Sequence, residues 1–150
     1  MANNRAVLLV EDSDADSEAT VRALGKCPVP PLVHRCVDGD EALAFLRALG
    51  RTRDPDRWAA PAVVLLDLNL PGTDGREVLE QIKADDALKH IPVVIMTTSS
   101  ADADVRFCYR HGASGYMLKP VDLAKFATSV QQFVAYWFEA VELAPSPPGG

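Results

Sequence analysis

The chain lacks most of the features that mark secreted, membrane-spanning or nucleic-acid-binding proteins. Its three cysteines are odd in number, widely spaced and without metal-ligand spacing, which is typical of reduced thiols in a cytoplasmic protein. No apolar run is long enough to cross a membrane, and the N-terminal run is too short for a signal peptide. Basic residues are not in excess, because the formal net charge is −6. We therefore expect a cytoplasmic protein that binds neither membranes nor nucleic acid.

Apolar sequence is plentiful enough for one hydrophobic core. Hydrophobic residues make up 48% of the chain and charged residues 24%, as in globular proteins. A length of 150 residues suits one domain rather than two. Only residues 145–150 are low in complexity. We predict a single domain over residues 1–144 and a disordered tail over residues 145–150.

Short apolar runs alternate with helical patterns five times along the chain. The runs are residues 6–10, 32–37, 62–66, 92–96 and 114–118. This alternation predicts parallel strands joined by right-handed crossovers, with helices on both faces of the sheet. The expected fold is an α/β, doubly wound, five-stranded parallel sheet. In the flavodoxin-like strand order 2-1-3-4-5, the first and third strands are neighbours.

The last helical pattern, over residues 122–143, is unusually long and aromatic. A helix of this length would measure about 30 Å, which is more than a sheet of five short strands spans. Its aromatic end is therefore predicted to overhang the domain and to form an interface. The residues of that interface would be Phe133, Trp137, Phe138 and Val141. The alternative is a helix that bends back and covers its own core.

Charges and hydroxyls interrupt the apolar runs at their carboxyl ends. They are Glu11 and Asp12 after the first run, Asp67 after the third, Thr97 and Thr98 after the fourth, and Lys119 after the fifth. In open α/β sheets, ligands bind in the crevice outside these strand ends. We therefore expect these side chains to form one site.

Three carboxylates in one crevice resist joint ionisation unless a cation offsets their charge. Oxygen-only ligands suit Mg²⁺, with Mn²⁺ as a substitute. Asp12 and Asp67 would bind the metal directly, Glu11 would hold it through water or orient Asp12, and the Asn69 carbonyl would complete the set. Lys119, as a point charge, suits a phosphate.

A carboxylate beside Mg²⁺, a lysine and a hydroxyl together describe a phosphoryl acceptor. Phosphoryl transfer needs chiefly in-line positioning and neutralisation of charge on the equatorial oxygens. Asp67 would be the nucleophile, with Lys119 and Thr97 beside it.

The sequence resembles the receiver domain of bacterial two-component response regulators over residues 6–134. The matching motifs are LVED at residues 9–12, LDLNLPGTDG at 66–75, IMTT at 95–98 and GASGYMLKP at 112–120. The resemblance implies that Asp67 takes its phosphate from a phosphohistidine on a sensor kinase. It also implies that Thr97 is the switch hydroxyl, that Tyr116 turns inward on activation, and that the Lys119–Pro120 bond is cis.

A narrower resemblance is to the single-domain regulators paired with bacterial phytochromes. It depends on the long loop near Arg53, the Thr97–Thr98 pair and the aromatic final helix. Because nothing resembling an output domain follows Pro120, we expect the output to be binding itself, through a homodimer. Thr98 is bulkier than the residue often found at this position in the family, which leaves the lifetime of the phosphate open.

Three other functions share this pattern. An electron carrier of the flavodoxin type would bring an FMN phosphate against Glu11 and Asp12, which would repel it. An aspartate-nucleophile phosphatase would carry a second aspartate where this chain has Asn69, so we expect slow self-dephosphorylation rather than an enzyme. A relay carrier that passes phosphate to another histidine protein stays open as the alternative.

Overall fold

Five parallel strands form one sheet in the order β2-β1-β3-β4-β5, as predicted. The computed structural model describes residues 5–51 and 60–143. The strands are β1 (Ala6–Val10), β2 (Leu32–Cys36), β3 (Val63–Leu66), β4 (Val93–Thr97) and β5 (Gly115–Leu118). β1, β3 and β4 are buried along their whole length, because helices cover both faces of the sheet.

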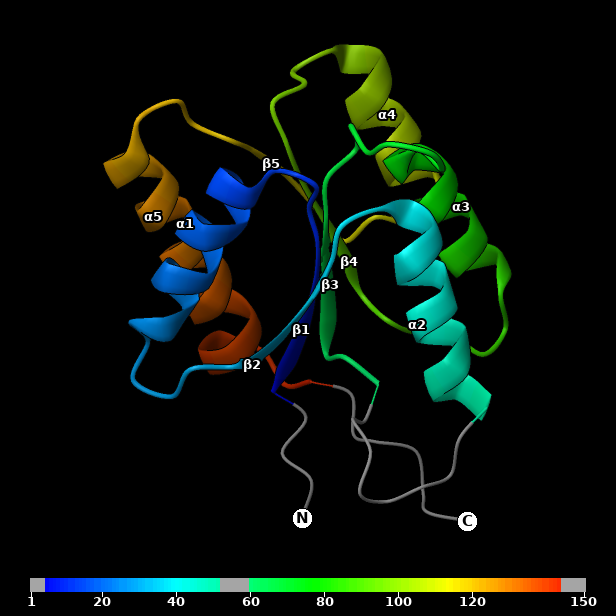
Figure 1. Cartoon of the computed structure of the whole chain (residues 1–150), viewed down its shortest axis with the longest axis horizontal. Helices are drawn as coiled ribbons and strands as arrows, with labels where there is room; N and C mark the ends of the chain where they lie inside the picture. Colours follow the sequence, from blue (N-terminus) through cyan, green and yellow to red (C-terminus); the bar gives the residue numbers. More distant parts are fainter. Residues whose placement is uncertain (1–4, 52–59, 144–150) are drawn as a thin grey trace.

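The helices lie in two layers (Figure 1). They are α1 (Asp14–Gly25), α2 (Gly39–Arg51), α3 (Gly75–Ala84), α4 (Asp102–Arg110) and α5 (Leu123–Val134), followed by the π-helix η1 (Ala135–Ala140). One face of the sheet carries α1 and α5, and the other carries α2, α3 and α4. Side chains of Ser13, Asp74 and Asp122 cap α1, α3 and α5 by accepting hydrogen bonds from backbone N–H groups.

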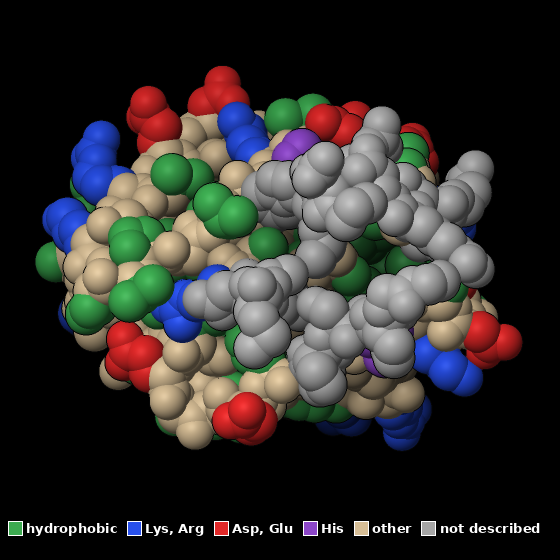
Figure 2. Space-filling view, turned by 90° about the horizontal axis from the view of Figure 1, so that it is seen from below, with side chains coloured by type: hydrophobic (Ala, Val, Ile, Leu, Met, Phe, Trp, Pro, Cys, Tyr) green, Lys and Arg blue, Asp and Glu red, His purple; other side chains and the backbone are tan. Residues whose placement is uncertain are grey.

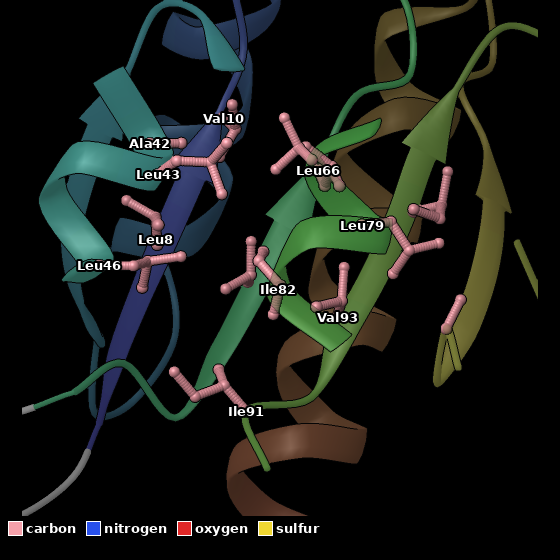
Figure 3. Close-up of a cluster of buried hydrophobic side chains, with 14 of the residues drawn as sticks. Leu8, Val10, Ala42, Leu43, Leu46, Leu66, Leu79, Ile82, Ile91 and Val93 are labelled. Carbon is pink, nitrogen blue, oxygen red and sulfur yellow. The ribbon is translucent and has the colours of Figure 1, made fainter. Parts of the chain in front are cut away.

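The sheet separates two hydrophobic cores. In the larger one, leucine, isoleucine and valine side chains of α2 and α3 pack against β1, β3 and β4 (Figure 3). The other lies between the sheet and the helices α1 and α5. Because apolar side chains anchor the strands on both faces, the carboxyl ends of the strands are held in fixed positions.

The end of the last helix does not overhang the domain, so the predicted exposed stripe is wrong for two of its four residues. Phe133 and Phe138 are buried in the core beneath α5, and Trp137 packs against that core while half-buried. The wider turn of η1 redirects the chain after Val134. Arg5 holds this turn in place, because its guanidinium donates to the Phe138 carbonyl at 3.1 Å and lies over the Phe138 ring.

Two predictions fall outside the described residues: the loop around Arg53 and the disordered tail over residues 145–150. Within residues 5–51 and 60–143, no helix is long and apolar enough to cross a membrane. Figure 2 shows the end of the molecule away from the carboxyl ends of the strands. On the described part of that face, the acidic side chains are spread around the rim.

Candidate functional site

The sheet ladder brings the carboxyl ends of β1, β3 and β5 to one edge of the molecule. The Asp67 N–H donates to the Val10 carbonyl at 3.1 Å, so Asp67 lies next to the end of β1. The Lys119 N–H donates to the Thr97 carbonyl at 2.8 Å, which places Lys119 beside the end of β4. The predicted site residues therefore gather because each directly follows or ends a strand of one parallel sheet.

The Lys119 ammonium is the centre of the site. Its Nζ lies 2.6 Å from Glu11 Oε1, 2.9 Å from Asp67 Oδ2 and 2.9 Å from Asp16 Oδ2. The side chains of Lys119, Glu11 and Asp67 are each at most 8% exposed, whereas that of Asp16 is 40% exposed. Glu11, Asp67 and Lys119 meet as predicted, and Asp16 joins them from α1.

Sequence reasoning did not identify Asp16. Acidic residues are common in the first turn of a helix, where they interact favourably with the helix dipole. Asp14 lies in the same turn and pairs instead with Arg35. One feature of the sequence could have indicated Asp16. The Ser13 cap begins α1 directly after the strand-end acids, so the first turn of this helix lies close to the site.

Burial sets the electrostatics of this group. It raises the pKa of Glu11 to about 7, with hydrogen bonding to Lys119 acting in the opposite direction. Burial alone would lower the pKa of Lys119, but its hydrogen bonds to Glu11, Asp67 and Asp16 raise that pKa above its ordinary value. The ammonium therefore stays charged under all physiological conditions.

Glu11, Asp12 and Asp67 could hold a metal ion together. Each offers a carboxylate oxygen, and these oxygens lie within 4.8 Å of one another. Glu11 and Asp67 are buried whereas Asp12 is exposed, so such an ion would have protein ligands on one side and solvent on the other. The Asn69 N–H donates to Asp67 Oδ1 at 3.2 Å, which keeps Asn69 beside the cluster. This oxygen-only, strongly acidic set fits a hard divalent cation.

The two residues expected to form a switch lie on neighbouring strands. Thr97 is fully buried at the end of β4, and its Oγ1 accepts from the Ser99 N–H at 3.5 Å. Tyr116, in β5, packs against the larger core while its hydroxyl donates to the Ser99 carbonyl at 2.8 Å. Burial raises the pKa of Tyr116. The tyrosine ring thus points inward, and Ser99 contacts both residues.

A second polar network, which the sequence did not predict, extends from this loop to α3. Ser99 Oγ donates to Asp104 Oδ2 at 2.6 Å, and Arg76 Nε donates to Asp104 Oδ1 at 2.8 Å. Arg76 also pairs with Asp74, the cap of α3. We call Asp74, Arg76, Ser99 and Asp104 the Arg76 network. It joins the β4–α4 loop to the helix that follows Asp67.

The expected cis bond is wrong: the peptide bond between Lys119 and Pro120 is trans. Three carboxylates, one from α1 and one directly after each of β1 and β3, hold the lysine ammonium at the site instead.

A family model described as the response regulator receiver domain matches residues 7–131. The chain belongs to this family. It is 40% identical over 139 residues to response regulator Rcp1 of a Synechocystis strain, covering 93% of this chain and 92% of Rcp1. The crystal structure of the phosphorylated cyanobacterial phytochrome response regulator RcpA is 37% identical with a TM-score of 0.86, covering 95% of this chain and 100% of RcpA. The Mn²⁺-bound form of Rcp1 is 39% identical with a TM-score of 0.84, covering 94% and 99% of the two chains.

The protein is therefore a phosphoacceptor response regulator of the two-component type. Receiver domains take phosphate from sensor histidine kinases and bind a divalent metal ion, which agrees with the carboxylate cluster of this chain. The matched receiver domain is a signalling module. The relatives are themselves response regulators, so the relay-carrier alternative is not favoured.

Proposed function

We propose that Asp67 is the phosphoacceptor and that its phosphate comes from a phosphohistidine of a sensor histidine kinase. The observation that carries the proposal is the position of the Asp67 carboxylate. It is buried, it contacts the Lys119 ammonium through Oδ2, and it shares a metal-binding geometry with Glu11 and Asp12. A carboxylate with a cation on one side and a metal site on the other suits phosphoryl transfer.

In the transfer step, a carboxylate oxygen of Asp67 forms a bond to phosphorus as the P–N bond of the phosphohistidine breaks. The electron pair of that bond stays on the imidazole nitrogen of the kinase, which takes up a proton. Lys119 offsets the charge on the phosphoryl oxygens. The buried positions of Lys119 and Asp67 keep this ion pair partly out of water, which strengthens it.

Glu11, Asp12 and Asp67, together with the carbonyl of Asn69, would hold Mg²⁺, with Mn²⁺ as a substitute. When bound, the cation neutralises charge on the phosphoryl oxygens. Rcp1, which is 39% identical to this chain, has a structure in an Mn²⁺-bound form, and this supports the assignment. Slow self-dephosphorylation by water, and self-phosphorylation from small donors, belong to the same proposal.

Thr97 and Tyr116 would transmit the phosphorylation. An aspartyl phosphate gains negative charge and acceptor oxygens, which Thr97 Oγ1 can approach and Lys119 can neutralise. Because Ser99 contacts both Thr97 and Tyr116, a movement of Thr97 would reach Tyr116 through Ser99. The surface formed by α4, β5 and α5 would then shift between two states.

The partner of this regulator is proposed to be a phytochrome-type kinase in the cytoplasm. RcpA is named a phytochrome response regulator, and the three cysteines of this chain are free thiols. A homodimer also belongs to the proposal. Of the four residues first predicted for its interface, only Trp137 and Val141 are partly accessible, so a dimer would use the rest of the α4–β5–α5 surface.

The test is incubation with Mg²⁺ and acetyl phosphate, followed by intact mass measurement. Wild type should gain one phosphoryl group, and Asp67→Asn should gain none. Asp14→Asn, an exposed acid of α1 that pairs with Arg35, is the matched control and should behave like wild type. EDTA should abolish the adduct. An equal adduct on Asp67→Asn, or none on wild type, would contradict the assignment.

A further inference from the structure

The three carboxylates around Lys119 differ in what else they can bind. Glu11 and Asp67 also belong to the cluster whose oxygens lie close enough to share a metal ion. Asp16 does not belong to that cluster, although its Oδ2 lies as near to the Lys119 ammonium as Oδ2 of Asp67 does, at 2.9 Å. Two partners of Lys119, Glu11 and Asp67, could therefore also bind a metal ion, whereas the third, Asp16, could not.

A cation in this cluster would compete with Lys119. It would draw on the same Glu11 and Asp67 carboxylates, and its charge would repel the ammonium. Lys119 must nevertheless stay beside Asp67 if it is to neutralise a phosphoryl group there. Among the described residues that contact Lys119 Nζ, Asp16 is the anion outside the metal cluster, so its whole charge stays available to the ammonium.

We infer that Asp16 is a positioning residue, which keeps the Lys119 ammonium beside Asp67 once a metal ion occupies the Glu11–Asp12–Asp67 cluster. This inference rests on the proposed function of Asp67. In this role Asp16 contacts neither phosphate nor metal. Helix α1 would then take part in the reaction as well as covering the sheet.

The carboxylate of Asp16 can be tested without disturbing the start of α1. The hydrogen bonds of Asp16 within α1 involve its backbone and not its carboxylate. The Asp16 N–H donates to Ser13 Oγ, and the Asp16 carbonyl accepts from Thr20 Oγ1. Asp16→Asn keeps both groups and removes only the charge. Asp14→Asn removes the same charge from the same helical turn, so it controls for the helix dipole and for net charge.

The first measurement follows the Lys119 ammonium directly. Uniformly ¹⁵N-labelled proteins are studied by ammonium-selective proton–nitrogen NMR at low temperature, and the Lys119 signal is identified by its absence in Lys119→Met. In wild type, Asp14→Asn and Asp16→Glu the signal should persist through a Mg²⁺ titration. In Asp16→Asn it should be present without metal and disappear as Mg²⁺ saturates the site. A signal that survives saturation in Asp16→Asn would overturn the inference.

The second measurement separates positioning from a simple charge effect. At saturating Mg²⁺, the phosphorylation rate of Asp16→Asn with acetyl phosphate should fall about tenfold below that of Asp14→Asn, the lower range for losing a partner that orients a functional group. Asp16→Glu should recover most of the rate, and the Mg²⁺ dissociation constants of Asp16→Asn and Asp14→Asn should agree within about twofold.

If Asp16→Asn instead binds Mg²⁺ weakly and regains the control rate at high Mg²⁺, Asp16 acts through the metal and the inference is wrong. Failure of the proposed function looks different, because wild type and Asp14→Asn would then take no phosphate either. The NMR titration would still decide whether Asp16 holds Lys119.

Discussion

The acidic site and the Arg76 network lie at the same edge of the sheet but balance their charges differently. In the acidic site, three carboxylates (Glu11, Asp16 and Asp67) share the Lys119 ammonium, and a fourth, Asp12, lies close to Glu11 and Asp67. In the Arg76 network, one guanidinium serves two carboxylates, and the Ser99 hydroxyl donates a further hydrogen bond.

This difference indicates which of the two regions can bind a ligand. The Arg76 network satisfies its polar groups by itself and needs nothing further. The acidic site keeps an excess of negative charge, with two of its four carboxylates buried, which a divalent cation can offset. The first region is thus suited to hold the loop that bears Ser99, and the second to bind a metal and react.

The largest effect is expected when each region loses its cation. Lys119→Met leaves Glu11 and Asp67 buried without a counter-charge, so metal-free protein should lose about 3 kcal/mol of unfolding free energy. Arg76→Met leaves Asp74 and Asp104 with access to water and should cost about 1 kcal/mol. Urea unfolding in EDTA measures both. Mg²⁺ should restabilise Lys119→Met more than Arg76→Met, and equal responses would contradict the contrast between the two regions.

The two regions meet at the first residue of α3, where Gly75 lies against the Asp67 backbone. A methyl group on Gly75 would collide with the Asp67 carbonyl oxygen and lie 2.6 Å from Leu68 Cα. Gly75→Ala should therefore cost about 2 kcal/mol of unfolding free energy, because backbone must shift to make room. Thermal unfolding followed by circular dichroism would measure the loss. The same change at Gly25, where a methyl group meets nothing within 4 Å, should be neutral or slightly stabilising.

The position of each strand end could be predicted from sequence because it depends on local pattern. An apolar run that stops at a charge fixes both the strand and the side chain that follows it, and this predicted Glu11, Asp67, Thr97 and Lys119 at one edge. The parallel order of the strands then determined which of these residues are neighbours.

Contacts between distant segments could not be predicted in the same way. The Arg76–Asp104 pair spans 28 residues and depends on how α3 and α4 pack. The hydrogen bond from Arg5 to Phe138 spans 133 residues, and together with the π-helix it turns the aromatic end onto the core. Asp16 was missed because its contact with Lys119 depends on the angle at which α1 leaves β1. Periodicity carries no information about that angle.

The smallest effect should come from Asp104, and its dependence on pH makes it diagnostic. Hydrogen bonds from Ser99 and then Arg76 hold the pKa of Asp104 below its ordinary value of 3.8. The folded state thus favours the carboxylate, and this stabilisation is present above the ordinary pKa and lost as pH falls through the lowered one. Asp104→Asn should therefore be less stable than wild type by about 1 kcal/mol near neutral pH. That difference should shrink below about pH 4.

Asp102→Asn, which removes an exposed acid from the same first turn of α4, is the matched control and should show no such pH-dependent difference. Urea unfolding of the three proteins between neutral and acidic pH would measure it. A constant difference between Asp104→Asn and wild type across the whole range would mean that the charge on Asp104 contributes nothing. The Arg76 network would then be held by its geometry alone, and the balance of charge would no longer distinguish it from the acidic site.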